Sequence, residues 1–117
     1  PRDDTSGCTK EAVAFSTLKD QFDAAGVTVM GISKDSLASH EKFASKHALT
    51  VPLLSDEHAD VCEAYGVWAE KSMYGKKYFG IERSTFLIDG EGRIARVWRK
   101  VKVPGHAEEV LDAVKAL

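Results

Sequence analysis

Cys8 stands where a turn is predicted to become a helix, and this position changes the chemistry of its thiol. Thr5 and Ser6, just before it, are residue types that favour the N-cap of a helix. Glu11 falls in the first turn, where a carboxylate complements the helix dipole. Apolar residues then recur at helical spacing: Ala12, Phe15, Leu18 and Phe22. The pattern predicts a helix over residues 9–24, with Cys8 in or beside its first turn.

A thiol needs strong local stabilisation to act as an anion at neutral pH. A free cysteine has a pKa of about 8.5, and bringing it to about 6 takes about 3.4 kcal/mol, at 1.36 kcal/mol per unit. A helix N-terminus supplies roughly 0.3–2 kcal/mol. A cation at contact distance supplies up to ~4 kcal/mol at an effective dielectric constant of about 20. A reactive Cys8 thiolate therefore requires an arginine or lysine that reaches it from another part of the chain.

Several stretches of the sequence, in collinear order, resemble one family. Pro1, Thr5 and Cys8 form a Pro-x-x-x-Thr-x-x-Cys pattern, which resembles the peroxidatic signature of the peroxiredoxins. Residues 3–11 are similar to the bacterioferritin comigratory protein subgroup, also called PrxQ. Three later stretches resemble the same subgroup: residues 52–56, 64–68 and 80–89. Together they make the resemblance specific and extend it over the whole chain.

The resemblance implies a role for each of five residues. Cys8 matches the peroxidatic cysteine, whose thiolate attacks the peroxide oxygen and becomes a sulfenic acid. Thr5 would hydrogen-bond the peroxide, and Pro1 would shield the thiolate from water. Arg83 matches the arginine that stabilises the thiolate and the developing charge, and Glu11 matches the glutamate that helps to hold that arginine. Arg83 is therefore the cation expected to converge on Cys8.

Each of these residues also has a purely structural interpretation. Cys8 could be a small buried hydrophobic residue, and Thr5 could serve only as the N-cap of the helix. Arg83 could be a solvated strand residue, Pro1 a turn residue, and Glu11 a surface carboxylate near the helix dipole. Peroxide consumption by the chain separates the two interpretations.

The second cysteine bears on how an oxidised Cys8 would be reduced. In this subgroup a resolving cysteine often stands five residues after the first, where this chain has Val13, or in the next helix, near Phe43 and Ala44. Cys62 remains, and its flanking pattern favours a packed structural thiol over a resolving one. The resemblance then implies a one-cysteine mechanism in which thioredoxin, or glutathione with a glutaredoxin, reduces Cys8.

Composition limits the other functions open to the chain. A net charge of −2 over 117 residues gives no basic surface for binding nucleic acid or an anionic membrane.

His58 and Cys62 have the spacing of a metal-ligand pair, but a second pair is missing, and His40 and His47 are expected to be solvated. We expect no metal, haem, flavin or nicotinamide cofactor. Two distant cysteines favour a reducing compartment, the cytoplasm, and we expect a monomer or weak dimer.

The alternation of elements predicts an α/β fold with helices on both faces of a mixed sheet. The expected helices cover residues 9–24, 36–47, 59–65 and 107–117, and the expected strands cover 27–33, 51–54, 84–88 and 94–98. Leu37, Phe43 and Ala44 are the expected apolar face of the second helix. The aromatic residues of the looser segment 67–80 are expected to pack in the core, with a place at a peroxide entrance as the alternative.

The resemblance implies a single thioredoxin-like domain over residues 1–117, with a buried central strand leading into the motif. This sequence opens on the motif itself. The strands at 27–33 and 84–88 would then lack the neighbour between them, which leaves backbone groups unpaired in the core at a considerable cost. We therefore expect an N-terminally incomplete domain, unless another segment fills the gap.

Three functions remain open on this basis. The first is a thiol peroxidase that reduces hydrogen peroxide and small organic hydroperoxides. The second is a peroxide sensor whose oxidised cysteine passes the oxidation to a partner protein. The third is an inactive scaffold in which Cys8 and Arg83 are not aligned. Turnover with a reductant separates the first two.

Overall fold

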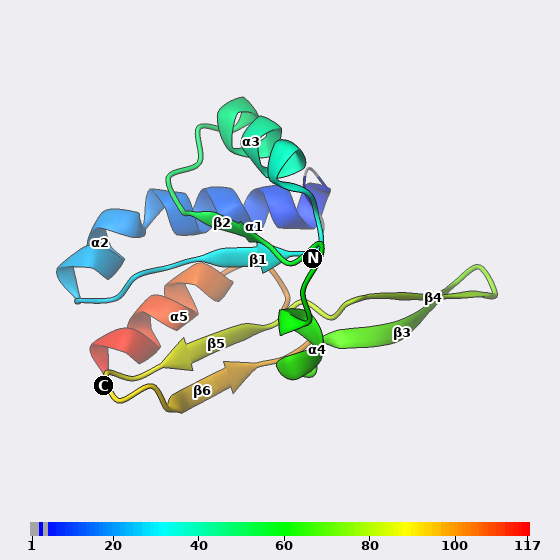
Figure 1. The fold of residues 1–117 in the computed structure, drawn as a ribbon. Coiled ribbons are helices and arrows are strands. Elements are labelled where there is room, and N and C mark those ends of the chain that lie inside the picture. Colours follow the sequence, from blue (N-terminus) through cyan, green and yellow to red (C-terminus); the bar gives the residue numbers. More distant parts are fainter. Residues whose placement is uncertain (1–2, 4) are drawn as a thin grey trace.

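Five helices and six strands form the part of the chain that the structure describes, which is residue 3 and residues 5–117 without the side chain of Met73 (Figure 1). The structure is a computed structural model. Its helices are α1 (Ser6–Thr17), α2 (Lys19–Ala24), α3 (Leu37–Lys46), α4 (Val61–Ala64) and α5 (His106–Lys115). Its strands are β1 (Gly31–Ser33), β2 (Leu53–Ser55), β3 (Trp68–Met73), β4 (Lys76–Ile81), β5 (Thr85–Ile88) and β6 (Ile94–Trp98). This order follows the predicted alternation, with one additional hairpin and a first helix split in two.

The first helical stretch breaks at Leu18. This residue has φ −91° and ψ 2°, so it ends α1 and serves as the N-cap of α2. The expectation of one continuous helix over 9–24 was therefore wrong, although the pair ends before Gly26 as predicted. Phe15 on α1 and Phe22 on α2 keep the predicted apolar face, since both are buried, with ring centroids 5.7 Å apart.

The strands pair as three separate two-stranded ladders. β1 and β2 run parallel, with Gly31 opposite Leu53. β5 and β6 form the predicted antiparallel hairpin, with Thr85 opposite Trp98. Among the described residues no strand is hydrogen-bonded between β1 and β5, the place where the sequence predicted a missing neighbour.

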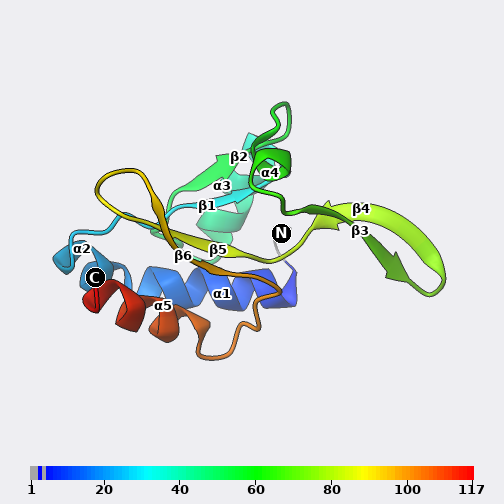
Figure 2. The same ribbon diagram turned by 90° about the horizontal axis from the view of Figure 1, so that it is seen from below.

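Helices cover both faces of these strands, as the sequence predicted (Figures 1 and 2). α1 and α5 lie in contact on one face, and α2 packs against α5. α3 lies on the opposite face, packed on β2. The main core contains eight buried residues: Phe15, Phe22, Val51, Leu87, Ala107, Val110, Leu111 and Val114.

Residues 67–80, predicted to be a looser segment, instead form the β3–β4 hairpin, which projects from the body of the molecule (Figures 1 and 2). Its turn places Tyr74 at φ +52° and Gly75 at φ +78°, the positive pair that favours a tight hairpin turn with the natural strand twist. Tyr74 is 98% exposed and Phe79 61% exposed. The expectation that these aromatic residues pack in the core was wrong, because the hairpin extends beyond any layer that could cover them.

Asp56 organises the start of α4 from a fully buried position. Its carboxylate accepts hydrogen bonds from the backbone N–H groups of Val61 at 3.1 Å and Cys62 at 2.8 Å, and Lys34 Nζ lies 3.2 Å away. Burial alone would raise the pKa of Asp56, but these hydrogen bonds hold that pKa well below its usual range. Asp56 therefore satisfies two backbone N–H groups at the start of α4, which is shorter than the helix expected over residues 59–65.

His106 begins α5 and is buried beside β5, where its Nε2 lies 2.7 Å from Thr85 Oγ1. Burial lowers the pKa of His106. The negative charges of Glu11 and Glu109 act to raise that pKa, but their effect is smaller. The folded protein therefore favours the neutral ring, whereas the unfolded chain takes up a proton near pH 6.5.

This difference predicts a pH-dependent contribution to stability from His106. The contribution is complete above about pH 6.5 and is lost as the pH falls below that value, because the unfolded chain then binds a proton that the folded ring does not. In urea unfolding, the stability advantage of the wild type over His106→Gln should shrink between pH 7.5 and pH 5.5. An advantage that stays constant with pH would contradict the account.

Candidate active site

Cys8 and Arg83 meet although 75 positions separate them in the sequence. Cys8 is the third residue of α1 and is 8% exposed. Arg83 lies in the short connection between β4 and β5, and its Nη2 donates to Cys8 Sγ at 3.2 Å. A guanidinium at this distance contacts the thiol directly.

Glu11 binds the other terminal nitrogen of the same guanidinium. It lies three residues after Cys8 on α1, so the two side chains share a face of the helix. Arg83 Nη1 donates to Glu11 Oε1 at 3.0 Å. Glu11 Oε2 is buried and has no hydrogen-bond partner among the described residues. The planar guanidinium is thus fixed between one carboxylate and one sulfur, a geometry that a flexible lysine could not reproduce.

Hydrogen bonds to two other segments hold the backbone around Arg83. Glu82 N donates to Val67 O at 2.7 Å, and Val101 N donates to Arg83 O at 3.0 Å. Gly7 allows the guanidinium to approach, because a Cβ at this position would lie 2.9 Å from Arg83 Nη2. The residue before Cys8 is therefore small where the arginine needs room.

Opposing electrostatic contributions act on the Cys8 sulfur. The guanidinium 3.2 Å from the sulfur stabilises a negative charge there, and the first turn of α1 makes a smaller contribution of the same sign. Burial of the sulfur and the neighbouring carboxylate of Glu11 act in the opposite direction. The balance depends on Arg83, since it is the largest favourable contribution.

Thr5 is the N-cap residue of α1, with its backbone in the extended region. Its carbonyl accepts a hydrogen bond from Thr9 N at 2.8 Å, while its side chain makes no capping hydrogen bond to the helix. Thr5 is thus the N-cap residue through its backbone, and its proposed contact with peroxide stays a prediction. Pro1, the remaining residue of the predicted site, lies outside the described residues.

Cys62 occupies a setting opposite to that of Cys8. It is 2% exposed and packs with Val67 and Ile81, and the two cysteines do not form a disulfide with each other. Burial, reinforced by the hydrogen bond and charge of Asp56, raises the pKa of Cys62 to about 12. Thiol exchange requires a thiolate, so the folded protein holds Cys62 in an unreactive form.

Sequence reasoning misplaced two residues of α3. His40 is 5% exposed rather than solvated, and Leu37 is 67% exposed rather than part of the apolar face. The spacing of three between His40 and the buried Phe43 was the available signal, because residues three apart share a helix face. Among the described residues, His40, Asp3 and Asp35 lie close enough together that their nitrogen and oxygen atoms could hold a metal ion. His58, by contrast, is exposed while Cys62 is buried, so that spacing does not make a ligand pair.

Comparison with known proteins gives a consistent result over the whole chain. Residues 1–97 match the AhpC/TSA family. The putative peroxiredoxin bcp of Coxiella burnetii is 57% identical over 111 residues, which cover 95% of this chain and 74% of that protein. Peroxiredoxin Bcp of Xanthomonas campestris is 50% identical over 116 residues, which cover 99% of this chain and 72% of that protein.

Solved structures give the same fold. The bacterioferritin comigratory protein of X. campestris, described for its alkyl peroxide reduction activity, matches with a TM-score of 0.93 and 49% identity. The match covers 99% of this chain and 74% of that one. A cysteine-to-serine mutant of Xylella fastidiosa PrxQ matches with a TM-score of 0.94 and 50% identity, over 99% of this chain and 72% of the other. In the part of the chain that the structure describes, the helices are too short or too polar to cross a bilayer.

The contact between Arg83 and Cys8 predicts how the thiol responds to loss of the charge. Arg83→Gln keeps hydrogen-bonding groups but removes the cation, so the fraction of Cys8 present as thiolate at pH 7 should fall. Alkylation of Cys8 by iodoacetamide, followed by intact mass, should slow by roughly tenfold or more, where one decade corresponds to about 1.4 kcal/mol. Arg93→Gln, at an 80% exposed arginine, serves as the matched control. Equal alkylation rates in both variants would contradict the assigned role of Arg83.

Proposed function

Because the chain belongs to the AhpC/TSA family and is a peroxiredoxin of the Bcp type, we propose that Cys8 is the residue through which it reduces peroxides. The enzyme is a peroxidase, and peroxide is its substrate. The contact of 3.2 Å between Arg83 Nη2 and Cys8 Sγ carries the proposal. A buried sulfur held against a guanidinium has the setting that a nucleophilic thiolate requires.

The first half of the proposed reaction oxidises Cys8. The thiolate attacks one peroxide oxygen, a sulfur–oxygen bond forms and the oxygen–oxygen bond breaks. The leaving oxygen takes the electron pair and a proton and departs as water or as an alcohol, while Cys8 becomes a sulfenic acid. Arg83 stabilises the negative charge on sulfur and on the leaving oxygen. Glu11 keeps the guanidinium in place, Thr5 hydrogen-bonds the peroxide, and Pro1 shields the sulfur from water.

The second half of the reaction uses an external thiol. That thiol attacks the sulfenic acid, releases water and leaves a mixed disulfide, which a second thiol then reduces. Thioredoxin, or glutathione with a glutaredoxin, would supply these thiols, and such a supply fits the reducing environment of the cytoplasm. The burial of Cys62 and its pKa of about 12 support a one-cysteine mechanism, because a resolving cysteine must reach and attack the oxidised sulfur.

Substrate range and assembly belong to the same proposal. Hydrogen peroxide and small organic hydroperoxides are the expected substrates, a choice supported by the alkyl peroxide reduction described for the X. campestris relative. A monomer or weak dimer is the expected state. The inactive-scaffold alternative required Cys8 and Arg83 to be unaligned, whereas their side chains are in contact.

Stopped-flow peroxide consumption, combined with intact mass after one equivalent of peroxide, tests the mechanism. The wild type and Cys62→Ser should both consume peroxide rapidly and gain the mass of one oxygen, because Cys8 alone reacts. Cys8→Ser should do neither.

Two results would overturn the proposal in different ways. Loss of two hydrogens by a monomeric wild type, but not by Cys62→Ser, would make Cys62 a resolving cysteine and exclude the one-cysteine mechanism. A wild type that reacts no faster than a free thiol would exclude Cys8 as the peroxidatic residue of this chain.

A further inference from the structure

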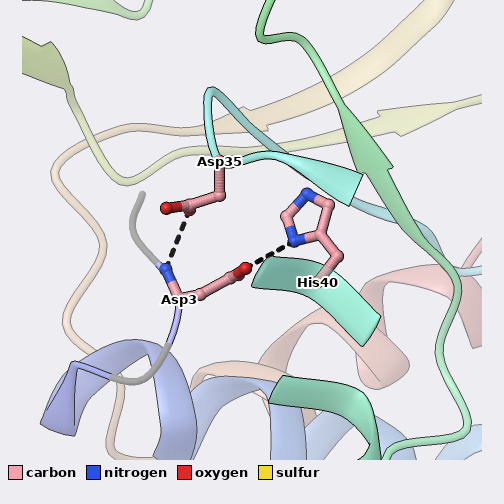
Figure 3. A group of neighbouring side chains, drawn as sticks. All are labelled: Asp3, Asp35 and His40. Atoms are coloured by element: carbon pink, nitrogen blue, oxygen red, sulfur yellow. Dashed lines mark hydrogen bonds and ion pairs between the residues drawn. The ribbon is translucent and has the colours of Figure 1, made fainter. Parts of the chain in front are cut away.

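A partly buried polar cluster lies outside the Cys8–Arg83 pair, and Figure 3 shows its three members, Asp3, Asp35 and His40. The Nδ1 atom of His40 lies 2.7 Å from Asp3 Oδ2. The side chains of this pair are 6% and 8% exposed respectively. We refer to these three residues as the Asp3 cluster. A polar contact withdrawn from water to this extent is a specific structural connection rather than a solvated surface pair.

The imidazole of His40 connects three parts of the fold. It projects from α3, and its Nε2 lies 3.0 Å from the carbonyl oxygen of Leu54 on β2. Both ring nitrogens therefore face oxygen acceptors, and a ring that carries a proton on each nitrogen donates to both. Ser39 Oγ donates to the same carboxylate oxygen of Asp3, at 2.8 Å. α3 thus holds the Asp3 side chain through two neighbouring residues.

The backbone of Asp3 is held as well. Its N–H donates to Asp35 Oδ2 at 2.9 Å (Figure 3). Ser33 Oγ donates to that same oxygen at 2.7 Å. Asp35 follows the end of β1, so the N-terminal segment is tied to a strand by its backbone and to α3 by its side chain. Two attachments at one residue fix both its position and its orientation.

This attachment lies next to the site in the sequence. Asp3 precedes Thr5 by two residues and Cys8 by five, and Thr5 is the residue where α1 begins. A residue of extended chain spans at most about 3.3–3.6 Å, so a fixed position of Asp3 limits how far Thr5 can move from it. Neither Arg83 nor Glu11 contacts Asp3 in the described structure, which makes the cluster a second, separate attachment.

We propose that His40 is a positioning residue for the peroxide reaction, which holds Asp3 so that Thr5 and the first turn of α1 present peroxide correctly to Cys8. The proposal rests on the proposed function, because it assumes that Thr5 and Cys8 meet the peroxide. His40 itself touches neither the substrate nor the sulfur. Its effect should appear in the rate of reaction with peroxide and not in the charge state of Cys8, which depends on Arg83.

The test compares His40→Leu with His40→Gln in the whole chain. Leucine fills the space without a donor, whereas glutamine keeps an amide donor that can reach Asp3. We expect His40→Leu to lower the second-order rate with hydrogen peroxide roughly tenfold, as a misplaced reacting group does. His40→Gln should recover most of that loss. The ultraviolet absorbance of the Cys8 thiolate should stay at the wild-type level in both variants.

Two further variants control the experiment. Asp3→Asn weakens the same contact from the other side and should also lower the rate, which keeps the test valid if His40→Leu does not fold. His58→Gln changes an exposed histidine and should keep the wild-type rate. A metal held by the Asp3 cluster would instead make the wild-type rate fall in EDTA and recover with added zinc.

Three results would overturn the inference: a wild-type rate in His40→Leu and Asp3→Asn, equal losses of rate in the leucine and glutamine variants, or a rate that depends on EDTA. A wild type that reacts with peroxide while His40→Leu is unimpaired excludes only the role of His40. A wild type that does not react excludes the proposed function itself.

Discussion

The contact between the Arg83 guanidinium and the Cys8 sulfur is the interaction on which the rest of the site depends. The sulfur is buried at the start of α1, and burial disfavours a charged form, so a thiolate at this position depends on a nearby cation. The cation belongs to the connection between β4 and β5. The backbone of this connection forms hydrogen bonds to neighbouring segments, which hold it in place. Gly7 leaves the space and Glu11 supplies the second contact, so α1 carries every other part of the arrangement.

The two cysteines carry the same functional group in opposite electrostatic surroundings. Cys8 lies beside an arginine at a helix start, whereas Cys62 lies beside the Asp56 carboxylate in a separate apolar cluster. Asp56 accepts hydrogen bonds that keep it ionised, and its negative charge opposes a second anion at Cys62. One fold therefore places a cation beside one sulfur and an anion beside the other.

Patterns that extend over a few residues account for the features that the sequence could predict. The i, i+3 spacing of Cys8 and Glu11 places them on one helix face, and the resemblance to peroxiredoxins identified Arg83, whose long-range contact no local pattern contains. Ser36, which caps α3, and the β5–β6 hairpin were predictable from turn and cap chemistry. The break at Leu18, the extra hairpin and the burial of His40 depend on tertiary packing, which overrides local propensity. The spacing from Phe43 indicated a shared helix face for His40, but its polar partner Asp3 lies 37 positions away, where no local pattern reveals it.

The most direct test of the central claim is a double-mutant cycle on Glu11 and Arg83, read as the second-order rate of peroxide reaction. If Glu11 acts only by holding the guanidinium, Glu11→Gln should slow the wild type but have almost no further effect once Arg83→Gln is present. The two changes would then be strongly non-additive. Fully additive losses would show that Glu11 and Arg83 act independently, and would contradict an account in which one guanidinium joins the carboxylate to the reactive sulfur.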